Sequence, residues 1–383
     1  MGQQLTLDSF MVEPRRKKRR TSRRVGKLKI AKKDMDLGIV EAKNTGPCYL
    51  LSVVYDGKKR KALVKLYDPQ THDIIFWYDN TGHLPYFLTD LPPDKVQEID
   101  KIVNHPSFDH VEVVEKYDLL KDAKVRMTKI VMKEPRSVGT VREYVPKAWE
   151  AHIKYFNNYI YDMRLIPGML YKIENGVLKE VKVEIPEEIA KHVEKLFNVG
   201  DYEFKELVKE WLPLFQLPPP KLKRLALDIE VYTATRNRIP DPREAEEKII
   251  SVSLVGSDGL KRVLLLHRKD VEFGHKPLEY PENVEIEIFD SERQLIAEVF
   301  TVINSYPILL TFNGDNFDLP YLYHRAKRLG FNEKHIPIII AEEGARLKKG
   351  IHIDLYRFFN NKAIQVYAFG GRYKEFTLDA KAS

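Results

Sequence analysis

The sequence contains a single cysteine, Cys48, among 383 residues. One cysteine excludes a disulfide within the chain and a metal cluster held by several thiolates. The sequence also has no apolar stretch near the ~20 residues that a membrane helix needs, and its polar N-terminus is unlike a signal peptide. These absences predict a cytoplasmic protein with no membrane partner, and the length predicts two or three domains.

Most of the chain lacks a net positive charge, although the net charge of the whole sequence is +7. Residues 1–33 contain 12 Lys or Arg against Asp8 and Glu13, a balance of +10, which leaves −3 for residues 34–383. The basic run at 15–24 predicts a disordered arm that binds DNA phosphates by counterion release. A solubilising tail without a fixed partner has the same composition, and the run alone does not separate the two.

A short peptide precedes the basic run. It resembles the peptide that docks on DNA sliding clamps, in which aliphatic and aromatic side chains share one face of a helical turn. The matching residues are Gln4, Leu7, Phe10 and Met11. Met11 stands where a second aromatic residue is usual, which weakens the expected binding. The alternative is a frayed terminus.

The region after residue 45 is rich in predicted strands, at 49–55, 62–67 and 74–78, which form an antiparallel meander. Aromatic residues there are interleaved with lysines, a composition typical of a platform for single-stranded nucleic acid and also of a small β core. Helices are predicted at 147–163, 187–197 and 202–211. Pro218-Pro219-Pro220 then predicts a linker at 216–220. The expected domains are a basic arm at 1–33, a β-rich N-terminal domain at 34–215 and a second domain at 221–383.

The second domain has an α/β pattern. Strands are predicted at 224–232, 249–254, 262–266, 284–289 and 307–312. Ser291-Glu292-Arg293-Gln294 has the form of a capping box and opens a helix with an apolar face. A helix at 319–329 is expected to stop at Gly330.

Two acidic clusters occur in this domain, Asp228-Ile229-Glu230 and Asn313-Gly314-Asp315-Asn316-Phe317-Asp318. Strand alternation places Asp228 and Glu230 on one face. Each cluster has a simpler explanation, an exposed strand face for the first, and a tight turn with Asp318 as a helix N-cap for the second. Both clusters lie at the ends of apolar strands in one domain, so both are expected at the same edge of a sheet. Carboxylates gathered in this way bind pairs of hard divalent cations.

Leu227-Asp228-Ile229-Glu230 and the stretch Thr311 to Leu322 resemble the first and second motifs of the 3′–5′ proofreading exonuclease in family B DNA polymerases. Leu84-Pro85-Tyr86-Phe87 resembles the N-terminal domain of that family, and Ile353-Asp354-Leu355-Tyr356 its exonuclease domain. The likeness extends from about Tyr49 to Ala380 and is strongest to the replicative polymerases of crenarchaeal thermophiles.

The resemblance implies an N-terminal β-rich domain followed by an RNase H-like 3′–5′ exonuclease domain with two metal ions. Asp228 would bridge both ions, Glu230 would bind the ion that activates water, and Asp318 would hold the other ion. Asn313 and Phe317 would contact the terminal nucleotide. Ligation by oxygen alone suits Mg²⁺ or Mn²⁺. Asp315 is not expected to be a ligand, because the family motif places the catalytic carboxylate at its last Asp.

The third exonuclease motif of the family, Tyr-x-x-x-Asp, has no match between the second motif and Ser383, because Tyr373 and Asp379 have the wrong spacing. The palm-domain carboxylate motifs are also missing. We therefore expect the front portion of a family B DNA polymerase, with weak nuclease activity at best by itself and the remaining polymerase chain or subunit as a partner. The alternative is a non-catalytic module that binds DNA and the sliding clamp and pairs with a separate catalytic subunit.

Overall fold

The computed structural model describes residues 39–183, 186–196, 204–208, 212, 220–234, 239–269, 271, 283–341 and 344–371. Two compact units divide between Leu222 and Lys223, and they are called here the N-terminal and C-terminal units. The predicted basic arm, the clamp-binding peptide and residues 216–219 of the predicted linker lie outside the described residues. Within the described ranges, no helix is long and apolar enough to cross a membrane.

The N-terminal unit is built on a five-stranded sheet of order β3-β2-β1-β7-β8. Its strands are β1 Cys48–Asp56, β2 Lys61–Tyr67, β3 Ile74–Tyr78, β7 Leu170–Glu174 and β8 Val177–Glu180. The pairs β1–β2 and β2–β3 are antiparallel, which confirms the predicted meander. A second sheet of order β4-β6-β5 contains β4 Tyr86–Thr89, β5 Phe108–Asp118 and β6 Ala123–Met132.

The aromatic side chains of these strands form the core of the N-terminal unit. Exposure is 6% or less for Tyr67, Phe76, Trp77, Tyr78, Tyr86 and Phe87. Lys65, one of the interleaved lysines, is itself buried at 5%. Side chains at this depth cannot stack on the bases of a single strand, so the core interpretation was right and the platform interpretation was wrong for these residues.

The described helical segments of this unit are α1 Pro93–Gln97, α2 Asp100–Val103, α3 Pro135–Val141, η2 Arg142–Tyr144, α4 Tyr155–Asp162 and α5 Glu187–Leu196, and residues 204–208 are also helical. The predicted helix at 147–163 was wrong in its first half. Glu150 has a φ of 59°, which no right-handed helix tolerates. Trp149 instead exchanges two backbone hydrogen bonds with Leu88 in β4.

The C-terminal unit contains a six-stranded mixed sheet of order β12-β11-β10-β9-β13-β16. Its strands are β9 Arg224–Val231, β10 Ile249–Gly256, β11 Lys261–Leu266, β12 Glu285–Phe289, β13 Ile308–Thr311 and β16 Ile351–Asp354, and a hairpin joins β14 Ile338–Ala341 to β15 Gly344–Leu347. The described helical segments are α7 Glu292–Asn304, α8 Asp318–Arg328, η3 Glu333–His335, α9 Leu355–Phe359 and α10 Lys362–Phe369. The strands predicted from residue 224 onward are confirmed within one to two residues.

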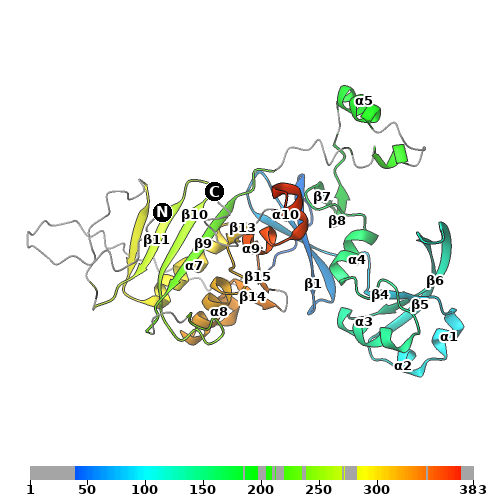
Figure 1. Cartoon of the computed structure of the whole chain (residues 1–383), viewed down its shortest axis with the longest axis horizontal. Helices are drawn as coiled ribbons and strands as arrows, with labels where there is room; N and C mark the ends of the chain where they lie inside the picture. Colours follow the sequence, from blue (N-terminus) through cyan, green and yellow to red (C-terminus); the bar gives the residue numbers. More distant parts are fainter. Residues whose placement is uncertain are drawn as a thin grey trace, which may run out of the picture. The chain divides into compact units, whose positions relative to one another are not determined.

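Helices α7 and α8 pack on one face of this sheet (Figure 1). Leu225, Leu227 and Ile229 of β9 point into that core, while the alternate residues of β9 face away from it. Ser291 is the N-cap of α7, but its side chain makes no capping hydrogen bond, so the predicted capping box is absent. Glu292 instead forms a buried ion pair with Arg325 of α8, with its Oε2 2.6 Å from Nη2.

Candidate active site

The first acidic cluster lies on a part of β9 that extends beyond its neighbour. Strand β13 runs parallel to β9, and the described pairing ends at Leu310 and Ala226. Asp228 and Glu230 therefore lie on the segment of β9 past the end of β13. Both are exposed, and both belong to the face of β9 that points away from the helices. The alternation of buried and exposed residues along the strand was predicted from the sequence.

Asp318 occupies the place where a longer β13 would have paired with β9. Its Oδ1 accepts a hydrogen bond of 3.1 Å from the backbone N–H of Ile229, the residue between the two acids of the first cluster. Asp318 is the first residue of α8 and is 4% exposed. The N-cap of α8 is Phe317, so the alternative explanation of Asp318 as an N-cap was wrong. The carboxylate joins the second acidic motif to the first.

Burial raises the proton affinity of all three carboxylates, and the charge of Asp228 adds to this at Glu230 and Asp318. Burial, followed by the charge of Asp228, raises the pKa of Asp318 to about 7. Partial desolvation against the sheet raises the pKa of Asp228, and desolvation together with the charge of Asp228 raises that of Glu230. Neither Asp228, Glu230 nor Asp318 forms an ion pair with another described residue. The site therefore holds negative charge that no protein cation offsets within the described chain.

Asn313 and Phe317 lie in the turn between β13 and α8. Asn313 has a left-handed backbone with a φ of 64°, and its Oδ1 accepts a hydrogen bond of 2.7 Å from Nδ2 of Asn316. Phe317 is partly buried, and its ring centroid lies 5.5 Å from that of Tyr321. Both residues border Asp318 in the chain, so both are placed where a molecule at the carboxylates could meet them.

Asp354 is a further residue of this region, and no role was predicted for it from the sequence. It ends β16, is 6% exposed, and accepts backbone N–H groups from Asn313 at 2.8 Å and from Asp315 at 3.1 Å. Asp315 is also engaged: Nε of Arg357 lies 2.8 Å from its Oδ2. The sequence does contain a pattern that could have identified Asp354: an acidic residue at the end of an apolar strand, directly before a helix. The two acidic clusters likewise lie at the ends of apolar strands.

A hard divalent cation fits the donor set of Asp228, Glu230 and Asp318, because all its donors are carboxylate oxygens whose charge no described cation offsets. No group of three or more His, Cys, Asp or Glu side chains in the described residues is gathered closely enough to hold a metal ion as it stands. The three acids therefore have the ligand chemistry and the common location that a metal site needs. Their side chains would have to move closer together to bind an ion.

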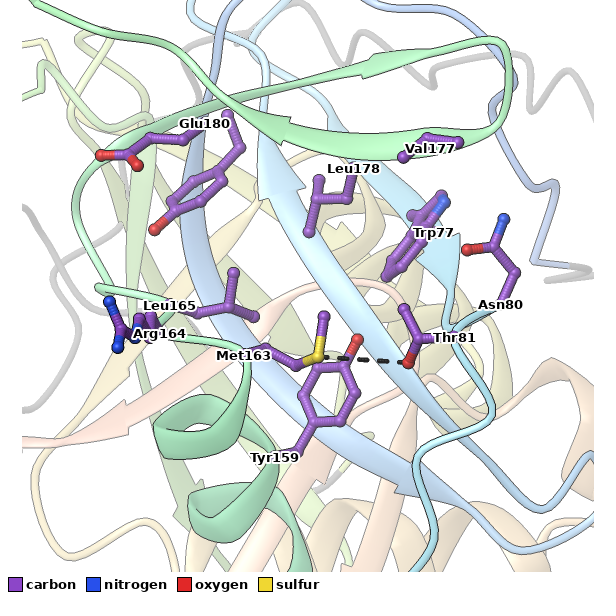
Figure 2. Close-up of a pocket in the computed structure, with 11 residues that line it drawn as sticks. Trp77, Asn80, Thr81, Tyr159, Met163, Arg164, Leu165, Val177, Leu178 and Glu180 are labelled. Carbon is purple, nitrogen blue, oxygen red and sulfur yellow. Dashed lines mark hydrogen bonds between the residues drawn. The ribbon is translucent and has the colours of Figure 1, made fainter.

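A separate cavity of about 170 Å³ lies in the N-terminal unit, between α4 and the strands β3, β7 and β8. Figure 2 shows Trp77, Tyr159 and Leu178 around it, with Arg164 and Glu180 together on one side. Trp77 donates its Nε1–H to the carbonyl of Gly176 at 2.7 Å, so its polar edge is already satisfied. None of the predicted site residues lines this cavity.

Comparisons with known proteins agree with the fold and identify the family. The family described as "DNA polymerase family B, exonuclease domain" matches residues 147–369. DNA polymerase 1 of Sulfolobus acidocaldarius is 46% identical over 387 residues, covering 100% of this chain and 44% of the relative. DNA polymerase 1 of Saccharolobus solfataricus is 50% identical, covering 89% and 38%. The solved family B DNA polymerase of Pyrobaculum calidifontis has a TM-score of 0.55 at 19% identity, covering 82% of this chain and 37% of that one, and supports the fold.

The fold and the family match define an RNase H-like exonuclease domain preceded by a β-rich domain. The chain belongs to the family B DNA polymerases. It spans less than half of the length of the relatives named above. The exonuclease domain of this family is metal-dependent.

Proposed function

We propose that Asp228, Glu230 and Asp318 form the acidic centre of a 3′–5′ exonuclease that removes nucleotides from the 3′ end of DNA as part of a family B DNA polymerase. The observation that carries the proposal is the hydrogen bond between Asp318 and the N–H of Ile229, because it brings the acids of both motifs to one place. Family membership supplies the reaction class.

The proposed cofactor is Mg²⁺ or Mn²⁺, held by these three carboxylates. When bound, the ions supply Lewis acidity that activates water and offsets the charge on the departing 3′ oxygen. Asp228 and Glu230 offer their carboxylates from the exposed face of β9, and the hydrogen bond to the N–H of Ile229 holds Asp318 beside that strand. We assign Asn313 to hydrogen bonding with the terminal nucleotide and Phe317 to apolar contact with its base or sugar.

The proposal is tested with the 383-residue chain, a 5′-labelled single-stranded DNA, and either Mg²⁺ or Mn²⁺. We expect slow shortening from the 3′ end, because the third exonuclease motif of the family has no match in these 383 residues and only Asp228, Glu230 and Asp318 are proposed as metal ligands. Asp228→Ala should abolish this shortening. Asp290→Ala is the matched control, because this Asp is 91% exposed and pairs only with His267 in the described structure. Shortening that survives Asp228→Ala would contradict the proposal.

A Mn²⁺ titration separates this function from that of a non-catalytic module. We expect electron paramagnetic resonance to detect Mn²⁺ bound to the wild-type chain and not to Asp318→Ala. A wild-type chain that binds no Mn²⁺ would contradict the nuclease assignment and favour a module that binds DNA and pairs with a separate catalytic subunit.

The proposed partners are single-stranded and primer–template DNA, a sliding clamp and the remaining polymerase chain or subunit. The clamp would bind Gln4, Leu7, Phe10 and Met11, which lie outside the described residues. Phe10→Ala should weaken clamp binding in a calorimetric titration, and unchanged affinity would contradict this assignment. A replication protein acts where the DNA is, so the proposed location is the cytoplasm.

A further inference from the structure

The loop that carries the second acidic motif is anchored by one buried carboxylate. Asp354 is 6% exposed and accepts three backbone N–H groups. Its Oδ1 accepts from Asn313 at 2.8 Å and from Tyr356 at 2.9 Å, and its Oδ2 accepts from Asp315 at 3.1 Å. Hydrogen bonds between an ionised carboxylate and N–H groups are short and about twice as strong as neutral ones. Asp354 therefore ties the end of β16 to the turn that follows β13.

The same turn is held from its other side by Asp315. Oδ1 of Asp315 accepts the backbone N–H of Ala345 at 2.8 Å, and Oδ2 lies 2.8 Å from Nε of Arg357. Nδ1 of His352 is 3.4 Å from Oδ1. The carboxylate oxygens of Asp354 and Asp315 thus accept hydrogen bonds or ion pairs from the protein, whereas Asp228 and Glu230 face outward from β9.

The turn has an unusual and crowded backbone. Asn313 has a φ of 64°, in the left-handed region that Asn adopts more readily than other residues with a side chain. Gly314 is packed so tightly against Thr311 that a Cβ at this position would meet the Thr311 side chain. The turn leads directly to Asp318, whose Oδ1 must lie 3.1 Å from the N–H of Ile229. A shift at Asn313 or Asp315 therefore moves Asp318.

We propose that Asp354 is a positioning residue of the acidic site: it holds the backbone of Asn313 and Asp315 so that Asp318 meets Asp228 and Glu230, and it does not itself bind the metal. The inference rests on the proposed function, in which those three acids hold a divalent cation. Residues that orient metal ligands typically change metal affinity by about 10- to 100-fold when they are replaced.

The experiment uses the full 383-residue chain and two readouts, Mn²⁺ affinity by electron paramagnetic resonance and hydrogen–deuterium exchange of the peptide that covers 312–318. Asp354→Ala should weaken Mn²⁺ binding by about 10- to 100-fold and speed exchange at Asn313 and Asp315. Asp354→Asn keeps an oxygen that can accept the N–H groups of Asn313 and Tyr356, so it should recover part of both effects. Asp290→Asn serves as the control, with no change in either readout.

Two results would overturn the inference. One is unchanged exchange and unchanged Mn²⁺ affinity in both Asp354 variants. The other is a loss of Mn²⁺ in Asp354→Asn as complete as in Asp318→Ala, with normal exchange at 312–318, which identifies Asp354 as a direct ligand. If Asp354→Ala does not fold, Asp354→Asn carries both readouts. If the wild-type chain binds no Mn²⁺, the proposed function fails, whereas the exchange measurement still decides whether Asp354 anchors the turn.

Discussion

Replacing Asp318 with Asn should stabilise the C-terminal unit in metal-free solution. Burial and the charge of Asp228 raise the pKa of Asp318 from 3.8 to about 7. At ~1.4 kcal/mol for each pH unit, an ionised Asp318 lowers the free energy of unfolding by about 4 kcal/mol at pH 8. The Asn side chain carries no charge and keeps an oxygen for the N–H of Ile229, which Asp318 accepts at 3.1 Å. The variant therefore removes the cost and retains the contact.

The pH dependence follows from the direction of the shift. Because the folded-state pKa of Asp318 lies above its unfolded-state value, its contribution to stability is complete below pH ~3.9 and is lost as the pH rises through about 7. The advantage of Asp318→Asn over wild type should grow from about 2 kcal/mol at pH 5.5 to about 4 kcal/mol at pH 8.

Proteolysis across a urea gradient in EDTA, with the fragments identified by mass spectrometry, measures this advantage for the C-terminal unit. The N-terminal unit in the same sample is an internal control and should unfold at the same urea concentration in both proteins. Mn²⁺ should stabilise wild type and leave Asp318→Asn unchanged. Equal unfolding midpoints of the C-terminal unit in the two proteins at pH 8 would refute the reasoning.

Two further predictions concern packing around the site. In Gly314→Ala the new Cβ would lie 2.5 Å from Cβ of Thr311 and closer still to its Oγ1. We therefore expect urea unfolding to show about 1–3 kcal/mol of destabilisation, together with weaker Mn²⁺ binding. A variant as stable as wild type would contradict this prediction, because it would show that the turn can relax. Arg325→Met leaves the carboxylate of Glu292 buried without its cation and should lower the free energy of unfolding by about 3–5 kcal/mol. Arg328→Met removes a half-exposed ion pair and should lower it by at most about 1 kcal/mol in the same assay. Similar losses of stability in the two variants would contradict this prediction.

The strands and the common location of the acids could be predicted because each depends on short-range pattern. The alternation along β9 placed Asp228 and Glu230 on one face, and the apolar runs placed both clusters at strand ends. The parallel pairing of β9 with β13 then brings the clusters together. The metal-ligand roles of Asp228, Glu230 and Asp318 remain predictions.

The errors came where tertiary contacts outweigh local preference. Trp149 and Ile153 fall at helical spacing, yet Trp149 bridges to Leu88 in a distant strand. The capping-box pattern at residues 291–294 predicted a local contact for Ser291, but the neighbouring Glu292 is drawn into a buried pair with α8. The anchoring role of Asp354 depends on β16 lying beside β13, a pairing between segments about 40 residues apart that no local pattern specifies.

The early end of β13 has a consequence for tolerance of insertions. The described residues between Glu230 and Asn313 include the complete strands β10 to β13 and helix α7. We therefore expect length changes in the connections between these elements to leave the contact between Asp318 and Ile229 untouched. The five residues between Phe312 and Asp318 have no such freedom, because they must cover the distance from a strand end to the neighbouring strand. One extra residue there would turn Asp318 away from β9 by about 100° around the first turn of α8. We therefore expect the protein to tolerate insertions in the connections between the two motifs but not inside the second motif.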